Sequence, residues 1–478
     1  MEKVFNNEAV KAELISWFNE NGRRFADISK QIWDFAELQF EEFKSSQLLI
    51  KTLESEGFFI ERGVAGIPTA FVATYKNGEG PVIGTLGEYD ALAGLGCEIA
   101  DTYRPTGASG HGCGHNLLGT GAAAAAVAAR HVMEKFDIHG SVKFFGCPAE
   151  EGGSAKVFMV REHVFDNVDA IMSWHPANAN IVSEAAAMAI MSVRYQFHGK
   201  AAHAGVCPHL GRSALDAAIL MDVGVNYLRE HVQPDTRIQC VISNGGNVPN
   251  VVPDEAEIWY YIRAPKRQDL DSVFRRINLI AEGMAHTTET TVQWHVGSGA
   301  SCNGMPNSVI SALLRESLEI MGAPVFDDAD RAFAEKLNSS VSVQEKAQSM
   351  AQMYQITDPE IYQQDLCQFI QTARMDGVVA PYSGDGSDVA WQAPSAQLNT
   401  CCQPVGTGNH SWQQVVCSGS AIGQKGMLAA AKILAFGFLK ALSSPELLKK
   451  ARLELDGHLA EYPYSCPIPP EVKPGMKD

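Results

Sequence analysis

The chain has 478 residues and a formal net charge of −17. This length predicts two or three domains, and the acidic balance excludes nucleic acid and anionic membrane surfaces as partners, since both select a basic face. No apolar run reaches the ~20 residues that span a bilayer, and residues 1–25 lack the apolar centre of a secretory signal. The eleven cysteines are irregularly spaced and do not form a disulfide framework. We therefore expect a cytoplasmic protein.

The first part of the chain alternates between helical and extended patterns. The first 60 residues have helical periodicity, and short runs rich in Val, Ile and Thr at 69–75 and 81–86 predict strands. After a glycine-dense loop, the expected elements are an Ala-rich helix at 117–135, a strand at 141–145, a helix at 153–162 and a strand at 170–174. This alternation predicts an α/β fold with a mixed, mostly parallel sheet flanked by helices.

A second pattern begins near residue 190. The predicted order is strand 190–197, helix 213–227, strands 237–243 and 255–263, helix 269–285 and strand 290–296. This is the βαββαβ order of a ferredoxin-like unit. We therefore expect an inserted domain at 191–304 within a catalytic domain of residues 1–190 and 305–478. Residues 327–379 are polar and mostly helical, and predict a further insertion.

Four short segments beside predicted strands or in glycine-flanked loops carry side chains that bind metals. They are 110–116 with Cys113 and His115, 147–153 with Glu150 and Glu151, 173–176 with His175, and 406–410 with His410. Sites in α/β sheets form at the carboxyl ends of strands, so these segments can converge. Thiolate, imidazole and carboxylate together suit zinc, and with more oxygen donors manganese or cobalt. Together the four segments predict a metal centre.

Glu150 and Glu151 are adjacent, so their side chains cannot point the same way. One carboxylate can bind metal while the other accepts a proton from water. The alternative is a solvated acidic turn before the helix at 153–162, where the helix dipole favours negative charge. The pair alone does not decide between these interpretations.

Four longer motifs extend these segments: LGEYDALAG at 86–94, GHGCGHNLLG at 110–119, EEGGS at 150–154 and PHLGRSALD at 208–216. Jointly they resemble the amidohydrolase and aminoacylase branch of the two-metal exopeptidase family that includes glutamate carboxypeptidase. The resemblance extends over essentially the whole chain. It implies a metal-dependent exopeptidase fold in which the ferredoxin-like domain serves as a lid and dimerisation domain.

The resemblance also implies two divalent ions per subunit, Mn²⁺ or Zn²⁺, and a role for each matching residue. Cys113 stands where a metal-bridging group is expected, and Glu150 matches the general base. The other implied metal ligands are His115, Glu151, His175 and His410.

Three lid residues complete the implied site. His203 matches a histidine that reaches the active site of the other protomer, and Asn250 and Arg263 match a pair that binds the substrate carboxylate. The implied partners are a second copy of the chain or a related A subunit. From the residues alone, a buried core histidine is the favoured interpretation of His203, and Arg263 could be an ordinary strand-end charge.

One departure from the peptidase branch bears on substrate. That branch has a histidine ligand where this chain has Glu88, followed by an aspartate, here Asp90; the amidohydrolase branch instead uses a histidine beside the cysteine, here His115. The resemblance therefore implies an N-acyl amino acid substrate. Aminobenzoyl-glutamate is the first expectation, and indole-acetyl-aspartate or a dipeptide are the alternatives. Asn116, where the branch usually has aspartate, and the insertion at 327–379 depart from smaller aminoacylases.

Two other functions compete with this interpretation. A cysteine-nucleophile hydrolase would use Cys113 with His115, but it would leave Glu150, Glu151 and His410 without a role. A non-catalytic partner subunit would keep the fold without the chemistry. The presence of both Glu150 and a full ligand set argues against that second alternative.

Overall fold

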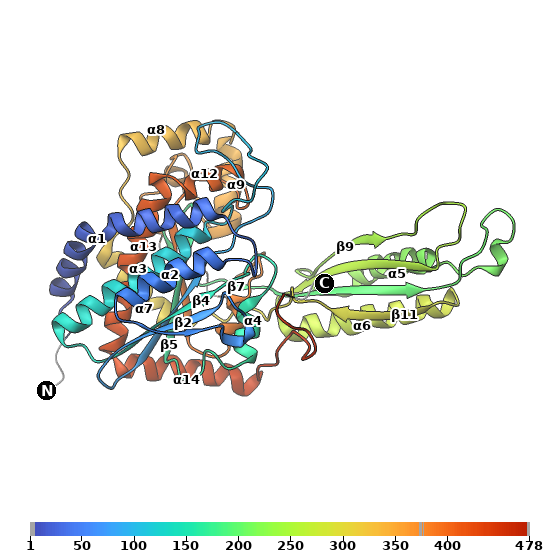
Figure 1. Cartoon of the computed structure of the whole chain (residues 1–478), viewed down its shortest axis with the longest axis horizontal. Helices are drawn as coiled ribbons and strands as arrows, with labels where there is room; N and C mark the ends of the chain where they lie inside the picture. Colours follow the sequence, from blue (N-terminus) through green and yellow to red (C-terminus); the bar gives the residue numbers. More distant parts are fainter. Residues whose placement is uncertain (1–4, 372–374, 376, 476–478) are drawn as a thin grey trace. The chain divides into compact units, whose positions relative to one another are not determined.

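The computed structural model describes residues 5–371, 375 and 377–475. These form two compact units, visible in Figure 1. Unit 1 contains the described residues of Met1–Ala185, Met305–Val378 and Val389–Tyr464, and unit 2 those of Ala186–Gly304, Val379–Asp388 and Ser465–Asp478. The domain limits expected from the sequence stay a prediction, and residues 372–374 and 376 of the expected insertion lie outside the described residues.

Unit 1 is built from helices around one sheet. Its helices are α1 (Asn7–Phe35), α2 (Phe43–Ser55), α3 (His115–Phe136), α4 (Ala155–Arg161), α7 (Ser308–Met321), α8 (Asp328–Leu337), α9 (Val343–Tyr354), α10 (Pro359–Tyr362), α12 (Trp412–Ser418), α13 (Ala421–Leu442) and α14 (Pro445–Glu461). Its strands are β1 (Phe59–Arg62), β2 (Phe71–Asn77), β3 (Val82–Glu88), β4 (Gly140–Cys147), β5 (Ala170–Ala177), β6 (Ile181–Ser183) and β13 (Ser395–Cys401).

The sheet of unit 1 has the strand order β1-β2-β4-β3-β5-β13-β6. β4, β3, β5 and β13 pair in parallel, whereas β2 is antiparallel to β4 and to β1, and β6 is antiparallel to β13. Five of the seven strands therefore point one way, which confirms the mixed, mostly parallel sheet. The carboxyl ends of the four central strands meet at one edge, where α/β folds place their sites.

The alanines of α3 let this helix pack closely on the sheet and on α13. Ala122 to Ala126 are fully buried, and α3 contacts β3, β4 and β5 as well as α1 and α13. At Gly119 a Cβ atom would lie 2.4 Å from the carbonyl oxygen of Glu88, so only glycine allows this approach. The close contact sets the first residue of α3, His115, beside the end of β3.

Unit 2 contains an antiparallel sheet of order β11-β8-β10-β9. In chain order its main elements are β8 (Ala189–His198), α5 (Ala214–Leu228), β9 (Arg237–Asn244), β10 (Glu255–Ala264), α6 (Arg267–Thr287) and β11 (Thr291–Val296). The order βαββαβ and the strand sequence 4-1-3-2 confirm a ferredoxin-like unit. Its smaller elements are β7 (Ala186–Ala187), β12 (Val379–Ala380), α11 (Gly386–Val389), and the 3₁₀ turns Pro208–Leu210 and Arg229–His231.

Each unit has its own apolar core. In unit 1, α1, α3, α7, α13 and the sheet supply the largest cluster, whereas in unit 2 alternate residues of β8 and β10 pack against α5 and α6. Among the described residues no single helix is long and apolar enough to cross a membrane. Only α13 and α14 together meet that length and composition, and they are bent by 96°.

Candidate metal centre

The metal-binding side chains of unit 1 follow the ends of its central strands. Glu88 ends β3, Glu150 and Glu151 follow β4, and His175 lies near the end of β5. The loop after β13 carries His410, whose backbone N–H donates to the carbonyl of Gly112 at 2.9 Å. Because these strands are parallel, the four segments that carry Glu88, Glu150 with Glu151, His175 and His410 meet at one edge of the sheet.

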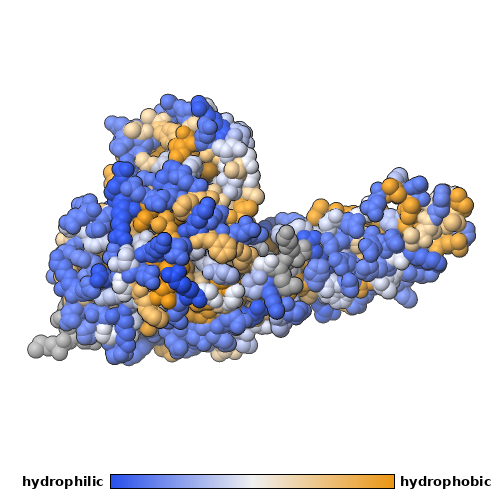
Figure 2. All heavy atoms as spheres, viewed as in Figure 1, coloured by the Kyte–Doolittle hydropathy of each residue, from blue (hydrophilic) through white to orange (hydrophobic). Residues whose placement is uncertain are grey.

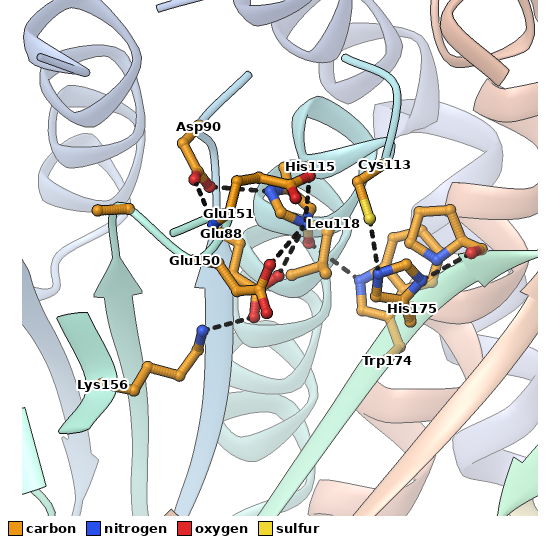
Figure 3. Close-up of polar contacts among 12 residues, drawn as sticks. Glu88, Asp90, Cys113, His115, Leu118, Glu150, Glu151, Lys156, Trp174 and His175 are labelled. Carbon is orange, nitrogen blue, oxygen red and sulfur yellow. Dashed lines mark hydrogen bonds and ion pairs between the residues drawn. The ribbon is translucent and has the colours of Figure 1, made fainter. Parts of the chain in front are cut away.

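The structure brings the donor atoms together in two groups that share one residue. Cys113, His115 and His175 form the first group, and Cys113, Glu151 and His410 the second; within each group the donor atoms all lie within 4.8 Å of one another. Cys113 Sγ is 3.4 Å from His175 Nε2 (Figure 3), and His410 Nε2 is 3.3 Å from Glu151 Oε2. Two neighbouring ions with a shared thiolate would fit these donors.

The chemistry of these residues also fits metal ions. His115 Nε2 and Glu151 Oε1 are buried and make no hydrogen bond, although Glu88 Oε2 lies 3.2 Å from the histidine nitrogen. Burial raises the pKa of the Cys113 thiol to about 12, so the thiolate that binds metal requires a nearby cation. Buried polar atoms without partners are costly, and a cation would satisfy them.

Asp90 orients His115 from the side opposite the donor groups. Its Oδ1 lies 2.8 Å from His115 Nδ1, and its Oδ2 accepts the backbone N–H of Glu151 at 2.9 Å. Burial raises the pKa of Asp90, but the charge and hydrogen bond of His115 outweigh this and lower it overall. An ionised carboxylate only accepts, so Nδ1 keeps its proton, and Nε2 is the ring nitrogen left for a metal, whose binding would displace the Nε2 proton.

Glu88 and Lys156 form an ion pair next to the donor groups. Lys156 Nζ lies 2.7 Å from Glu88 Oε1, and the lysine side chain is fully buried. Burial raises the pKa of Glu88, but the charges of Lys156 and His115 outweigh it and lower the pKa overall. Glu88, His115 and Glu150 also form a third set of close donor atoms, with Glu150 Oε2 3.9 Å from His115 Nε2. Figure 3 shows these carboxylates facing His115.

The similarity to known proteins agrees with this geometry. The chain is 41% identical over 466 residues to the B-type subunit of the p-aminobenzoyl-glutamate hydrolase of Escherichia coli K12, covering 95% of this chain and 96% of that protein. A crystal structure of the Bacillus subtilis YXEP protein, described as a dinuclear metal binding peptidase from the M20 family, superposes with a TM-score of 0.60 at 14% identity, over 89% of this chain and 99% of that one. The chain belongs to the M20 family.

Two further matches support the M20 assignment. The Peptidase dimerisation domain model matches residues 186–289, within unit 2. The Xaa-Arg dipeptidase of Mus musculus is 30% identical over 326 residues, which cover 66% of this chain and 72% of that enzyme. The M20 relatives are thus metal-dependent hydrolases of amide bonds.

The predicted lid residues of this M20 chain lie in unit 2. His203 is exposed, so the alternative of a buried core histidine is wrong. Its Nδ1 accepts the backbone N–H groups of Gly205 and Val206 at 3.2 and 3.1 Å. The proton therefore lies on Nε2, which can donate a hydrogen bond to another group.

Asn250 and Arg263 do not meet within one chain. The carbonyl of Asn250 accepts the N–H of Ala204, so Asn250 lies beside the His203 segment. Arg263 lies at the opposite end of β10, which begins at Glu255, and about 3.3 Å of rise per residue separates the two by more than 20 Å. Arg263 is half-buried, burial lowers its pKa, and its Nε has no hydrogen-bond partner. The expected carboxylate-binding pair is therefore not assembled by a single chain.

Two residues near the centre were not predicted from the sequence. Glu42 is fully buried and accepts the N–H of Ala149 at 2.8 Å, which holds that residue at a φ of +53° directly before Glu150. Lys156 follows the EEGGS motif, but a lysine on a short helix predicts a solvated surface. A glutamate and a lysine are ordinary residues in the sequence. Only their burial in the structure shows that they support the donor groups.

Proposed function

We propose that this chain hydrolyses the amide bond of an N-acyl amino acid, with p-aminobenzoyl-glutamate as its preferred substrate. The observation that carries the proposal is the pair of donor groups sharing Cys113, with Glu150 beside them, in a chain that matches a hydrolase of this substrate along nearly its whole length. The pairing with a related A subunit and the cytoplasmic location that we expect belong to the same proposal.

The proposed ligands are Cys113, His115, Glu151, His175 and His410. When bound there, two divalent ions, Mn²⁺ or Zn²⁺, would act as Lewis acids that polarise the amide carbonyl and lower the pKa of water. Glu151 contacts His410 through Oε2, which leaves Glu150 as the base. Glu150 takes a proton from the attacking water on a carboxylate oxygen and passes it to the leaving nitrogen.

The lid residues enter this proposal through a dimer. His203 presents Nε2–H, a donor suited to the oxyanion that develops on the scissile carbonyl. Because Asn250 lies next to His203 and far from Arg263, a dimer would pair Asn250 and His203 of one protomer with Arg263 of the other. Arg263 offers the bidentate geometry that carboxylates prefer.

Exposed apolar side chains on unit 2 are consistent with such an association. They gather at the end of the unit formed by the loops around 206 and 248, as Figure 2 shows, and on α5 and β9: Val206, Leu210, Val248, Val251, Ile219, Leu220, Val223, Tyr227, Val241 and Ile242. Exposed apolar surface gathered at one end of a unit is typical of interaction sites. A second copy or the related A subunit would cover it.

A hydrolysis screen tests the substrate and the metal together. The protein is treated with a chelator, then assayed with p-aminobenzoyl-glutamate, indole-acetyl-aspartate and a dipeptide, before and after addition of Mn²⁺ or Zn²⁺. We expect activity only after metal return, and the highest kcat/KM with p-aminobenzoyl-glutamate. Full activity without metal would refute the two-metal assignment, and a preferred dipeptide would refute the substrate.

Mixed dimers test the shared site. Glu150→Ala and His203→Ala chains are each assayed alone and then after mixing under conditions that exchange subunits. We expect each variant to be nearly inactive and the mixture to recover activity, because one site in the mixed dimer has both residues intact. A mixture no more active than its components would show that His203 does not act across a dimer.

A further inference from the structure

A cavity in unit 1 lies beside the metal centre, and none of the proposed metal-binding residues lines it. It has a volume of about 340 Å³, within the ~300–1,000 Å³ typical of small-molecule sites. Its lining residues come from the end of β5, from α9 of the insertion and from the loop before His410: Asn178, Glu345, Gln348, Ser349, Gln352, Met353, Tyr354, Thr407, Gly408 and Asn409.

The cavity adjoins the ligands along the chain on two sides. Asn178 follows His175 by three residues, and Asn409 directly precedes His410. Asn178 Nδ2 donates to the carbonyl of Thr407 at 3.1 Å, so a hydrogen bond joins the segment after His175 to the loop before His410. A group held here would therefore extend away from an amide placed at the donor atoms.

The third wall is one face of α9. Glu345, Gln348, Ser349, Gln352 and Met353 recur at intervals of three and four residues, which places them on a single helix face. The insertion is fastened to the loop before His410 by buried contacts. Asn338 Nδ2 donates to the carbonyl of Val405 at 2.8 Å. Gly406 lies against the side chain of Lys346, which pairs with Asp365 at 3.1 Å. The wall is thus part of the folded core of the site.

The lining indicates what kind of group would bind. Among the described residues that line the cavity, Glu345 is the one charged side chain, so a carboxylate would be disfavoured. Met353 and Tyr354 offer apolar and aromatic surface, which suits contact with a ring. The carboxylate of Glu345 and the amide oxygens of Gln348 and Gln352 belong to the α9 wall and can accept hydrogen bonds, which suits a group that donates them.

We propose that this cavity is the acyl-group subsite, in which α9 selects a neutral aromatic acyl group that carries a hydrogen-bond donor, such as an aromatic amine. The inference rests on the proposed function and extends it, because the insertion then determines which acyl group is accepted. The carboxylate half of the substrate, assigned to Arg263, requires a cationic site and would not enter this cavity.

Two variants and a matched control test the subsite. Ser349→Trp fills the cavity, Gln352→Ala removes a polar side chain from its wall, and Gln344→Ala alters an exposed glutamine of the same helix outside the lining. The ratio of kcat/KM for p-aminobenzoyl-glutamate to kcat/KM for N-acetyl-glutamate is measured for each. We expect this ratio to fall at least about tenfold in Ser349→Trp, about 3- to 10-fold in Gln352→Ala, and not at all in Gln344→Ala.

A binding measurement separates this proposal from the proposed function. Saturation-transfer NMR with neutral p-aminobenzamide, up to about 10 mM, is recorded on the zinc-loaded protein and on each variant. We expect binding that Ser349→Trp abolishes and Gln344→Ala retains. Absence of binding to the unaltered protein, or equal binding and an equal ratio in Ser349→Trp, would overturn the subsite. Binding that Ser349→Trp abolishes, in a protein that hydrolyses no N-acyl-glutamate, would support the subsite and refute the proposed function.

Discussion

Asp90→Asn tests how His115 is oriented, because it changes one atom of a carboxylate that makes two different hydrogen bonds. The asparagine amide can be placed in two ways. If its nitrogen faces His115, Nδ1 must become an acceptor, and the proton moves to Nε2, which then cannot bind metal. If its nitrogen faces Glu151, two N–H donors meet where a hydrogen bond of 2.9 Å existed. Either placement damages the site.

The size of the effect follows from these two contacts. Loss of a partner that orients a metal-binding histidine costs about 10- to 100-fold in metal affinity, or about 1.4–2.8 kcal/mol. The alternative placement leaves a buried backbone donor unsatisfied, at about 1–3 kcal/mol of unfolding free energy. We therefore expect Asp90→Asn to bind Zn²⁺ or Mn²⁺ at least about tenfold more weakly, with a matching fall in activity at limiting metal.

Competition with a chromophoric chelator measures the metal affinity, and urea unfolding of the metal-free protein measures stability. Asp169→Asn is the matched control, because Asp169 accepts the N–H of Val82 at 2.7 Å without contacting a histidine. We expect the control to bind metal as the unaltered protein does. Unchanged metal affinity in Asp90→Asn, at equal stability, would refute the assignment of the Nδ1 proton and of Nε2 as a ligand atom.

Two further predictions concern buried charges. Lys156→Met leaves the carboxylate of Glu88 without its 2.7 Å ion pair, and we expect a loss of about 3–5 kcal/mol in the unfolding free energy. Glu88→Gln in the double variant should restore part of this loss. Equal stability of Lys156→Met and the parent in urea unfolding would contradict the prediction. Burial and the charge of Asp90 raise the pKa of Glu42 from 4.5 to about 8, so the folded state binds more protons and stability falls as pH rises through that window. The Glu42→Gln variant cannot ionise at this position, so its unfolding free energy should not fall in this way. Between pH 5 and 8 the metal-free parent should lose roughly 2–4 kcal/mol more unfolding free energy than the metal-free variant. Parallel pH profiles of the two proteins in urea unfolding would show that Glu42 does not titrate in this window.

Much of the fold could be predicted because its signals are local. The Ala-rich run at 122–126 and the runs rich in Val, Ile and Thr have local helix and strand preferences that agree with the fold, and α3 and β4 lie where periodicity predicts them. Three of the four metal-binding segments follow predicted strands or lie in short loops beside them, so their convergence could be expected from a parallel sheet. The antiparallel pairing of β1, β2 and β6 was not predicted, because pairing direction depends on neighbours distant in the chain.

The residues that orient the site were harder to recognise. Asp90, Glu42 and Lys156 are common polar residues whose importance depends on burial, and burial results from packing between separate elements. Likewise, the resemblance implies that Asn250 and Arg263 bind one carboxylate, and the predicted strand already places Asn250 before it and Arg263 at its end, as β10 does. Extended backbone separates residues by about 3.3 Å each, so a short distance along the chain does not imply contact.

By itself, the sequence determined the class of the protein, through four motifs that resemble a known family, and the kinds of atoms available for chemistry, namely a thiol, imidazoles and paired carboxylates. Only the tertiary structure decided how those atoms group. Cys113 became the shared donor of two sets, Asp90 set the proton on His115, and α9 closed a cavity beside His410. The physical reason is that each of these contacts joins segments far apart in the chain, whose approach is decided by core packing and not by local conformational preference.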